Sequence, residues 1–373
     1  MTTHPVSLES ARASFVAGPG YLAACTMGLP TVETAQALRS DLDSWASGRA
    51  SAAAYGDIVE DARGAFARIV GVDVGRVAIG SQTSAQVSVV AAAVPDGAEV
   101  LCVEGDFSSV VFPFLEQRYR GVRVRCVPLH ALAASITHDT WLVAYSLVQS
   151  ATGAVADDAA IVRAARAHGA RTLVDLTQAA GVMPVDASRY DATVTHAYKW
   201  LCCPRGVAFA TFSASFAELL RPIQAGWYAG ESVWESCYGP EEQLASSARR
   251  FDVSPAWQAF VGAHPALSLF ASLDPAAVWQ HASGLGDALC RALGIPEQHQ
   301  AIVTWADPTG SALAALTAAG LVVSGRAGRV RVAFHLWNDV ADVERVAAAL
   351  RPAAALASQP VAAPAPRPAA ALR

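Results

Sequence analysis

The sequence is almost devoid of lysine. Of its 27 lysine and arginine residues, Lys199 alone is lysine and the remaining 26 are arginine. Arginine replaces lysine well for solubility and ion pairing, but it stays protonated near neutral pH and cannot act as an amine nucleophile. The loss of lysine elsewhere therefore indicates a chemical role for the amine of Lys199. The alternative is codon bias against lysine, with one residue surviving by chance.

Other absences exclude classes of protein. No apolar run of about 18 residues occurs, and no basic segment followed by an apolar one opens the chain, so we expect a cytoplasmic protein without a membrane span. The net charge of −5 offers no basic stripe to nucleic acid or to an anionic membrane. Seven scattered cysteines favour reduced thiols over a disulfide framework, and without Cys-x-x-Cys or His-x-x-x-His spacing we expect no metal. The glycine-rich loops of nicotinamide- and ATP-binding proteins are also missing.

A short β-branched run, residues 171–175, precedes the lysine and ends in the carboxylate of Asp175. This pattern is typical of a buried parallel strand, which presents its last side chain where ligands bind. A lysine with a lowered pKa forms a Schiff base with a carbonyl, and pyridoxal 5′-phosphate (PLP) is the commonest cofactor that needs one. PLP also needs an anion at its pyridine nitrogen. Lys199 and Asp175 therefore predict a PLP site, and Gln178 is placed to hydrogen-bond the phenolic oxygen of the ring.

The surrounding residues extend this pattern over a longer stretch. The spacing is Asp175-x-x-Gln178-x-x-Gly181-x-x-Pro184-x-Asp186, then Asp191, His196-x-x-Lys199 and Pro204-Arg205-Gly206. It resembles the cofactor signature of the class V aminotransferase family, fold type I PLP enzymes that include cysteine desulfurases, kynureninases and isopenicillin N epimerase. The resemblance extends from about Tyr21 to Leu350. It implies an α/β fold in which helices enclose a mostly parallel, seven-stranded-type sheet, with a small C-terminal α/β domain.

Alternating strand and helix segments agree with that fold. The segments that read as strands are 76–80, 99–104, 141–145, 171–175, 206–212, 301–305 and 329–334. The segments that read as helices are 32–45, 58–70, a run that begins near 83, 157–168, 257–273 and 339–350. We expect a lead (1–20), a large PLP-binding domain (21–260), a small domain (261–351) that includes the N-terminal segment, and a disordered Ala/Pro-rich tail (352–373).

The resemblance also assigns cofactor contacts. Ser81, Gln82 and Thr83 open a helix after a strand, an arrangement that binds phosphate through free N–H groups and the helix dipole. Phe107 falls where the family stacks an aromatic side chain on the pyridine ring, and His196 and Tyr198 belong to the lysine motif. Trp227 and Ser254 match segments that reach the phosphate of the neighbouring subunit. These matches imply a homodimer with shared active sites.

Substrate contacts follow from the same resemblance. Arg331 matches the arginine that holds the substrate α-carboxylate, for which a bidentate guanidinium is suited, and Arg326 and Arg329 are nearby alternatives. The remaining candidates lie on two segments that face the substrate in the family: Gln149, Ser150, Thr26, Gly28 and Leu29.

The implied function is that of a PLP-dependent transferase or lyase. It acts on an amino acid through an external aldimine and an α-carbanion, as an aminotransferase or a kynureninase-like lyase, with an epimerase or a C–S lyase as the alternative. A desulfurase needs a cysteine in the loop before the carboxylate arginine, and residues 311–328 contain none. A non-catalytic binding protein of the same fold is the alternative from another class, but Lys199 and Asp175 are both present. The substrate side chain and the step that follows carbanion formation stay open.

Overall fold

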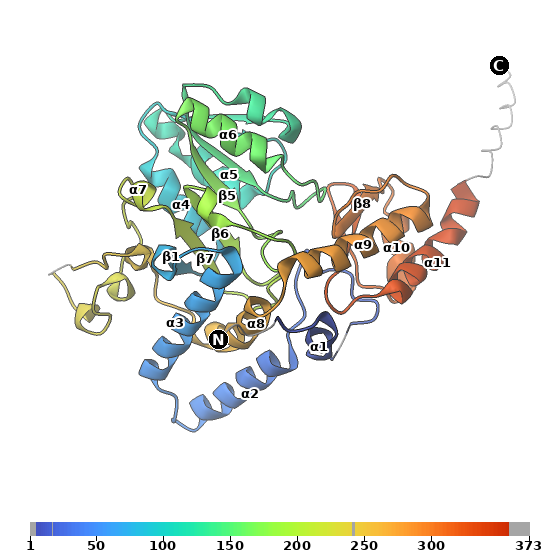
Figure 1. Ribbon diagram of the computed structural model, residues 1–373, viewed down its shortest axis with the longest axis horizontal. Coiled ribbons are helices and arrows are strands. Elements are labelled where there is room, and N and C mark those ends of the chain that lie inside the picture. The colour runs from blue at the N-terminus through green and yellow to red at the C-terminus, as the bar shows by residue number, and fades with distance from the viewer. Residues whose placement is uncertain (1–4, 17, 241–242, 358–373) are drawn as a thin grey trace, which may run out of the picture.

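Strands and helices alternate along the chain as the sequence predicts. The computed structural model describes residues 5–16, 18–240 and 243–357 (Figure 1). The strands are β1 (Val77–Gly80), β2 (Glu99–Val103), β3 (Arg123–Val127), β4 (Thr140–Ser146), β5 (Arg171–Asp175), β6 (Ala192–His196), β7 (Ala208–Phe212), β8 (Ile302–Ala306), β9 (Ser324–Arg326) and β10 (Arg329–Ala333). The helices are α1 (Leu8–Ala13), α2 (Val32–Ala46), α3 (Ala52–Val70), α4 (Thr83–Ala93), α5 (Ser108–Leu115), α6 (Asp158–His168), α7 (Ala214–Ala217), α8 (Trp257–Ala271), α9 (Pro275–Leu293), α10 (Ser311–Ala318) and α11 (Val340–Ala357).

The larger sheet has seven strands in the order β1-β7-β6-β5-β4-β2-β3. The strands from β3 to β6 pair in parallel, and β7 runs antiparallel to both of its neighbours. This confirms the mostly parallel sheet that the sequence predicts. Because β2, β4, β5 and β6 are parallel, their carboxyl ends lie at one edge, where open α/β sheets bind ligands.

Alternate residues along each strand enter two different cores. In β1, Val77 and Ile79 pack with α3, α6 and α8, whereas Ala78 packs with α4, α5 and α7 on the other face. Successive side chains of a strand point to opposite faces, so a strand that is apolar throughout is buried on both. The helices therefore form a layer on each side of the sheet (Figure 1).

A smaller unit follows, built on the antiparallel sheet β8-β10-β9 with α9, α10 and α11. The N-terminal segment joins this unit, because Tyr21 pairs with Val322 and Ala23 pairs with Ala333 in parallel bridges. The domain boundary expected after residue 260 falls inside α8, which packs on α2 and α3. We propose that the boundary lies after α8, between the elements of the large sheet and those of the small sheet.

The C-terminal helix is longer than the sequence predicts. We expected it to end at Leu350, but α11 continues to Ala357, through an alanine-rich stretch that favours helix. The rest of the expected tail, residues 358–373, lies outside the described residues. No helix in the described part of the chain is long and apolar enough to cross a membrane.

Candidate active site

Lys199 lies in the turn after β6 and is only 5% exposed. Its Nζ is 5.5 Å from the centroid of the Phe107 ring and 5.8 Å from that of the Tyr198 ring. Burial lowers the pKa of Lys199 to about 8, against the opposing charge of Asp175. A lysine with this pKa is partly deprotonated near neutral pH, so its amine is available to attack a carbonyl.

Asp175 ends β5, the strand beside β6. Its Oδ1 accepts a hydrogen bond of 2.8 Å from the backbone N–H of Thr177. None of the ion pairs formed by the described residues involves Asp175, and burial raises its pKa to about 6. A buried carboxylate without a cationic partner is stabilised by a ligand that brings a positively charged N–H, as a protonated pyridine ring does.

The N-terminus of α4 and the last residue of β6 offer anion-binding groups. Gln82, the N-cap of α4, makes no side-chain cap hydrogen bond, and Thr83 is buried in the first turn. The Nε2 of His196 is buried and lacks a partner among the described residues. Burial lowers the pKa of His196 to about 4, so its ring is neutral and able to donate one hydrogen bond. Together with Lys199, these groups fit a phosphate-bearing aldehyde such as PLP.

Phe107 lies at the N-cap of α5 and is 41% exposed, with one face of its ring toward Lys199. The preceding residue, Asp106, holds this segment in place. Its carboxylate accepts hydrogen bonds from the Ser146 hydroxyl (2.5 Å) and backbone N–H (2.8 Å), and from Gln149 Nε2 (3.2 Å). Asp106 was not among the predicted site residues, although its position directly before Phe107 was a signal.

Two of the three predicted glutamines, Gln149 and Gln178, are engaged with neighbouring parts of the site. Gln178 donates from Nε2 to the carbonyl of Cys25 (2.9 Å) and accepts at Oε1 from the indole N–H of Trp200 (2.8 Å). Gln149 donates to Asp106. Each amide therefore fixes the position of a segment that lines the site.

Arg331 on β10 is 1% exposed, and all its hydrogen-bond partners are neutral oxygens. Nη1 donates to the carbonyl and the hydroxyl of Ser150, Nη2 donates to the Thr26 hydroxyl (2.9 Å), and Nε donates to the Ser324 hydroxyl (3.2 Å). None of the ion pairs within the described ranges includes Arg331. A buried guanidinium without a carboxylate is suited to an anionic ligand. Ser150 and Thr26, both predicted, hold its orientation.

Gly28 brings the N-terminal segment against the lysine turn. Its N–H donates to the carbonyl of Tyr198 (2.9 Å). A Cβ on Gly28 would lie 2.1 Å from the carbonyl oxygen of Lys199, so no side chain is tolerated there. The neighbouring Leu29 packs against the core beneath. Gly28 therefore allows a close backbone contact that covers the lysine turn.

Trp227 and Ser254 lie in segments outside this cluster. The centroid of the Trp227 ring lies 5.3 Å from the ring centroids of both Tyr228 and Trp234. The side chain of Ser254 is exposed, two residues after the buried Asp252. Ser81 and Gln82 are also exposed.

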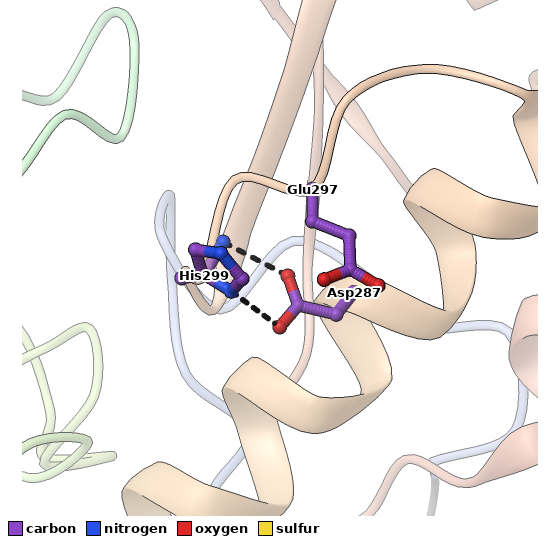
Figure 2. A group of neighbouring side chains, drawn as sticks. All are labelled: Asp287, Glu297 and His299. Atoms are coloured by element: carbon purple, nitrogen blue, oxygen red, sulfur yellow. Dashed lines mark hydrogen bonds and ion pairs between the residues drawn. The ribbon is translucent and has the colours of Figure 1, made fainter.

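Among the described residues, one group of metal-binding residue types lies apart from the lysine. Asp287 on α9, with Glu297 and His299 on the loop that follows, offers ligand atoms within 4.8 Å of one another (Figure 2). Asp287 already accepts a hydrogen bond from the His299 backbone and contacts His299 Nδ1 at 2.9 Å, and Glu297 pairs with Arg291. The expectation of no metal stays a prediction.

The comparison with known proteins shows the family of the chain. A family model for class-V aminotransferases matches residues 33–317. The chain belongs to the class-V aminotransferase family. This membership confirms the family, the fold and the PLP cofactor that the sequence predicts.

Relatives in this family have several different activities. Over 234 residues the chain is 29% identical to an uncharacterized aminotransferase of Bacillus subtilis, a match that covers 60% of this chain and 61% of that protein. Over 182 residues it is 30% identical to isopenicillin N epimerase of Streptomyces clavuligerus, covering 44% of this chain and 46% of that one. The chain thus spans less than two thirds of the length of these relatives.

Solved structures share the fold along most of the chain. A variant of C-DES with glycine covalently linked to its PLP cofactor superposes with a TM-score of 0.82 at 20% identity, covering 91% of this chain and 98% of that one. A cysteine desulfurase of Escherichia coli gives a TM-score of 0.80 at 20% identity, with coverage of 94% and 99%. At this level of identity the likeness shows the fold alone.

Proposed function

We propose that the protein is a PLP-dependent enzyme that acts on an amino acid, as an aminotransferase or a kynureninase-like lyase. One observation carries this proposal: the single lysine of the chain is buried with a lowered pKa in the turn after β6, and the neighbouring strand β5 ends in a buried carboxylate that forms no ion pair with any described residue. When bound, PLP supplies an electron sink for the substrate α-carbon. Family membership supports the reaction class and leaves the substrate open.

Each residue of the site has a role in that chemistry. Lys199 binds the cofactor aldehyde through Nζ and, once free, moves the proton of the substrate α-carbon. Asp175 holds the proton on the pyridine nitrogen. The first turn of α4, with Ser81, Gln82 and Thr83, binds the phosphate together with His196.

The other residues enclose the site and orient the substrate. The rings of Phe107 and Tyr198 present their faces to the amine of Lys199. Arg331 orients the substrate through its α-carboxylate, held by Ser150 and Thr26. Four further residues hold the segments that line the site in place: Gln178, Gln149, Gly28 and Leu29.

Epimerisation is the second candidate, supported by the likeness to isopenicillin N epimerase. It shares proton removal at the α-carbon and differs in where the proton returns. A C–S lyase also shares this first step. The absence of cysteine from residues 311–328 argues against a desulfurase, whose nucleophile lies in that loop.

We further propose a cytoplasmic homodimer. The exposure of Ser254 and the placement of Trp227 outside the lysine cluster support a role toward the neighbouring subunit's phosphate. Seven free cysteines support a reducing compartment. Sedimentation of the cofactor-loaded enzyme tests the assembly, and an active monomer would contradict shared sites.

Borohydride reduction of the holoenzyme followed by peptide mapping tests the central assignment. We expect a reduced pyridoxyl group on the peptide that contains Lys199, and none in Lys199→Arg. A label on a peptide without Lys199, or on no peptide, would refute it. Incubation of the loaded enzyme with single amino acids, with analysis for keto acid, ammonia or the D-isomer, then separates transamination, elimination and epimerisation.

A further inference from the structure

Three arginines share one face of the small sheet. In the pairing of β9 with β10, Arg326 lies opposite Arg329 and Ser324 lies opposite Arg331. Opposite residues of an antiparallel pair share a face, as do residues two apart on one strand. Arg331 Nε donates to the Ser324 hydroxyl on this face (3.2 Å), and its other nitrogens donate to Ser150 and Thr26, so the face turns toward the candidate site.

This face carries no neutralising acid. Across the described part of the chain, none of the ion pairs includes Arg326, Arg329 or Arg331. Arg329 donates to the hydroxyl (2.6 Å) and the carbonyl (3.2 Å) of Thr304. Arg326 is exposed and donates to the carbonyl of its neighbour Gly325 (2.8 Å). Like charges directly opposite each other destabilise a sheet, so the face favours an anionic ligand.

The charge of Arg326 reaches the reaction centre. It adds to the lowering of the pKa of Lys199, behind burial and the charge of Arg331, and it also contributes to the lowered pKa of Arg331. In the proposed function, the α-carboxylate of the substrate binds Arg331. The guanidinium of Arg326 then stays available to a second anionic group on the same ligand.

We propose that Arg326 binds an acidic group on the substrate side chain, so that the substrate is an amino acid with two acidic groups. This inference rests on the proposed function and names its substrate class. Arg331 orients the α-carboxylate, Arg326 selects the side chain, and Arg329 stays tethered to Thr304.

Matched amino acids that differ in charge and little in shape test this proposal. We expect the wild-type enzyme to process L-glutamate or L-aspartate with a kcat/KM above that of L-glutamine or L-asparagine. Arg326→Gln should lower kcat/KM for the acids by on the order of ten- to a hundredfold, the range for a hydrogen bond to a charged group, and leave the amides almost unchanged. Arg329→Gln removes the same charge from the same face and should have a smaller effect.

An equilibrium measurement separates selectivity from turnover. Glutarate should bind the holoenzyme more tightly than butyrate in calorimetry, and Arg326→Gln should abolish that preference. If neutral amino acids are processed and Arg326→Gln changes neither acids nor glutarate, the inference is overturned while the proposed function stands. If no peptide carries the borohydride label, the proposed function itself has failed.

A second inference concerns two cysteines on neighbouring strands. Cys102 of β2 and Cys126 of β3 are direct partners in the parallel register. Neighbouring strands lie about 4.8 Å apart, within the range of roughly 4.4–6.8 Å between the Cα atoms of a disulfide. Cys102 and Val124 both contact the core around α4 and α5, and Cys126, two residues after Val124, shares that face.

The two thiols differ in access to solvent. Cys126 lies on the edge strand and is exposed, whereas Cys102 is fully buried. The neighbouring Cys102 thiol lowers the pKa of Cys126 to about 7. An exposed thiol with substantial thiolate at neutral pH, beside a second thiol, is the arrangement of redox-responsive cysteines.

We infer that Cys126 and Cys102 form a peroxide-oxidisable pair. The Cys126 thiolate attacks hydrogen peroxide, so that an S–O bond forms, the O–O bond breaks and hydroxide leaves as water after protonation. Cys102 sulfur then attacks the sulfenic sulfur, an S–S bond forms, the S–O bond breaks, and water leaves with the Cys102 proton. Two thiols are oxidised and one peroxide is reduced to two waters. The new bond would tie β2 to the edge strand four residues before Asp106.

Peroxide treatment of the holoenzyme followed by alkylation and peptide mapping tests the pair. We expect a linked peptide that contains Cys102 and Cys126, with the other five cysteines still alkylated. In Cys102→Ala the sulfenic acid of Cys126 should persist and be trapped by dimedone, whereas Cys126→Ser should not react. Alkylation of both thiols after treatment, or links between other cysteines, would overturn the inference.

Discussion

Arg63 and Asp252, which are 189 residues apart in the chain, form a bidentate ion pair in the interior. Nη2 lies 2.6 Å from Oδ2 and Nη1 lies 3.1 Å from Oδ1, and the two side chains are 1% and 0% exposed. Asp252 also accepts from the backbone N–H of Ile79 (2.7 Å). The pair therefore fastens the segment that carries Ser254 to α3 and to β1, the strand that directly precedes Ser81.

Removal of one partner of this pair should destabilise the fold strongly. Arg63→Ala leaves Asp252 buried and unpaired, which costs about 3–5 kcal/mol. Urea unfolding of the apoprotein at pH 7 measures this loss. Glu60→Gln is the control, because Glu60 pairs with the same arginine from a side chain that is 48% exposed, and it should cost at most about 1 kcal/mol. Equal losses in the two variants would contradict the assigned role.

The reactivity of Lys199 should follow its lowered pKa. Because the chain has no other lysine, an amine-selective reagent reports on this residue once the α-amino group is separated by peptide mapping. In the folded apoprotein, the rate of modification should be half-maximal near pH 8. In urea the midpoint should move to about 10.4, the value of an unperturbed lysine. A midpoint near 10 in the folded protein would mean that burial does not control the amine.

Asp175→Asn should abolish amino-acid turnover and raise the stability of the folded apoprotein at pH 7. Burial raises the pKa of Asp175 to about 6, so the folded state binds more protons than the unfolded state between about pH 4 and pH 6. Wild-type stability therefore falls as pH rises through that window. The asparagine variant avoids this loss and should be about 3 kcal/mol more stable as apoprotein at pH 7. The advantage should vanish below about pH 4, and amino-acid turnover by the loaded variant should be lost.

The stability and turnover of Asp175→Asn can also contradict the role assigned to Asp175. A stability difference of equal size at pH 7 and at low pH would come from packing rather than from ionisation. Retained turnover would show that another group supports the pyridine nitrogen.

Arg331→Ala should separate substrate binding from cofactor binding. The cofactor's visible spectrum should persist, because in the proposed function Lys199, Asp175 and the phosphate-binding residues at the start of α4 hold the cofactor. Catalytic efficiency should fall by the roughly 2–5 kcal/mol of a lost charged contact, which is tens to thousands of fold. Arg331→Lys should rescue only in part, since a point charge does not reproduce the fork. If Arg331→Ala keeps near wild-type efficiency and Arg329→Ala loses it, Arg329 rather than Arg331 binds the α-carboxylate.

The sequence predicted the strands that show a continuous apolar, β-branched pattern. The apolar β-branched run before Asp175 appears as β5 with the expected bounds. Strand β3 was missed, because Arg123 and Arg125 alternate with apolar residues on an edge strand that is only partly buried. Strand β6 was missed because its threonines, buried on both faces, lack an apolar pattern.

Contacts between site segments that are distant in the sequence were not predicted. Asp106 matters because Ser146 and Gln149, from a different strand end, donate to it. The clamp on Arg331 likewise depends on contacts of Ser150 and Thr26 that no local spacing encodes. Lys199 was recognisable for the opposite reason, since its uniqueness is a property of composition and needs no partner.

The parallel bridge between Ala23 and Ala333 joins the segment before α2 to strand β10. Thr26, the contact of Arg331, lies 305 residues before it. Because a ribosome makes the chain from its N-terminus and domains fold as they emerge, the large sheet, which ends at Phe212, has all its strands long before β10 is made. The segment around Ala23 must wait for that strand. A nascent chain that stops before β10 therefore holds the strands of the large sheet without the contact between Thr26 and Arg331. The proposed substrate-binding arrangement can form only after β10 has been made.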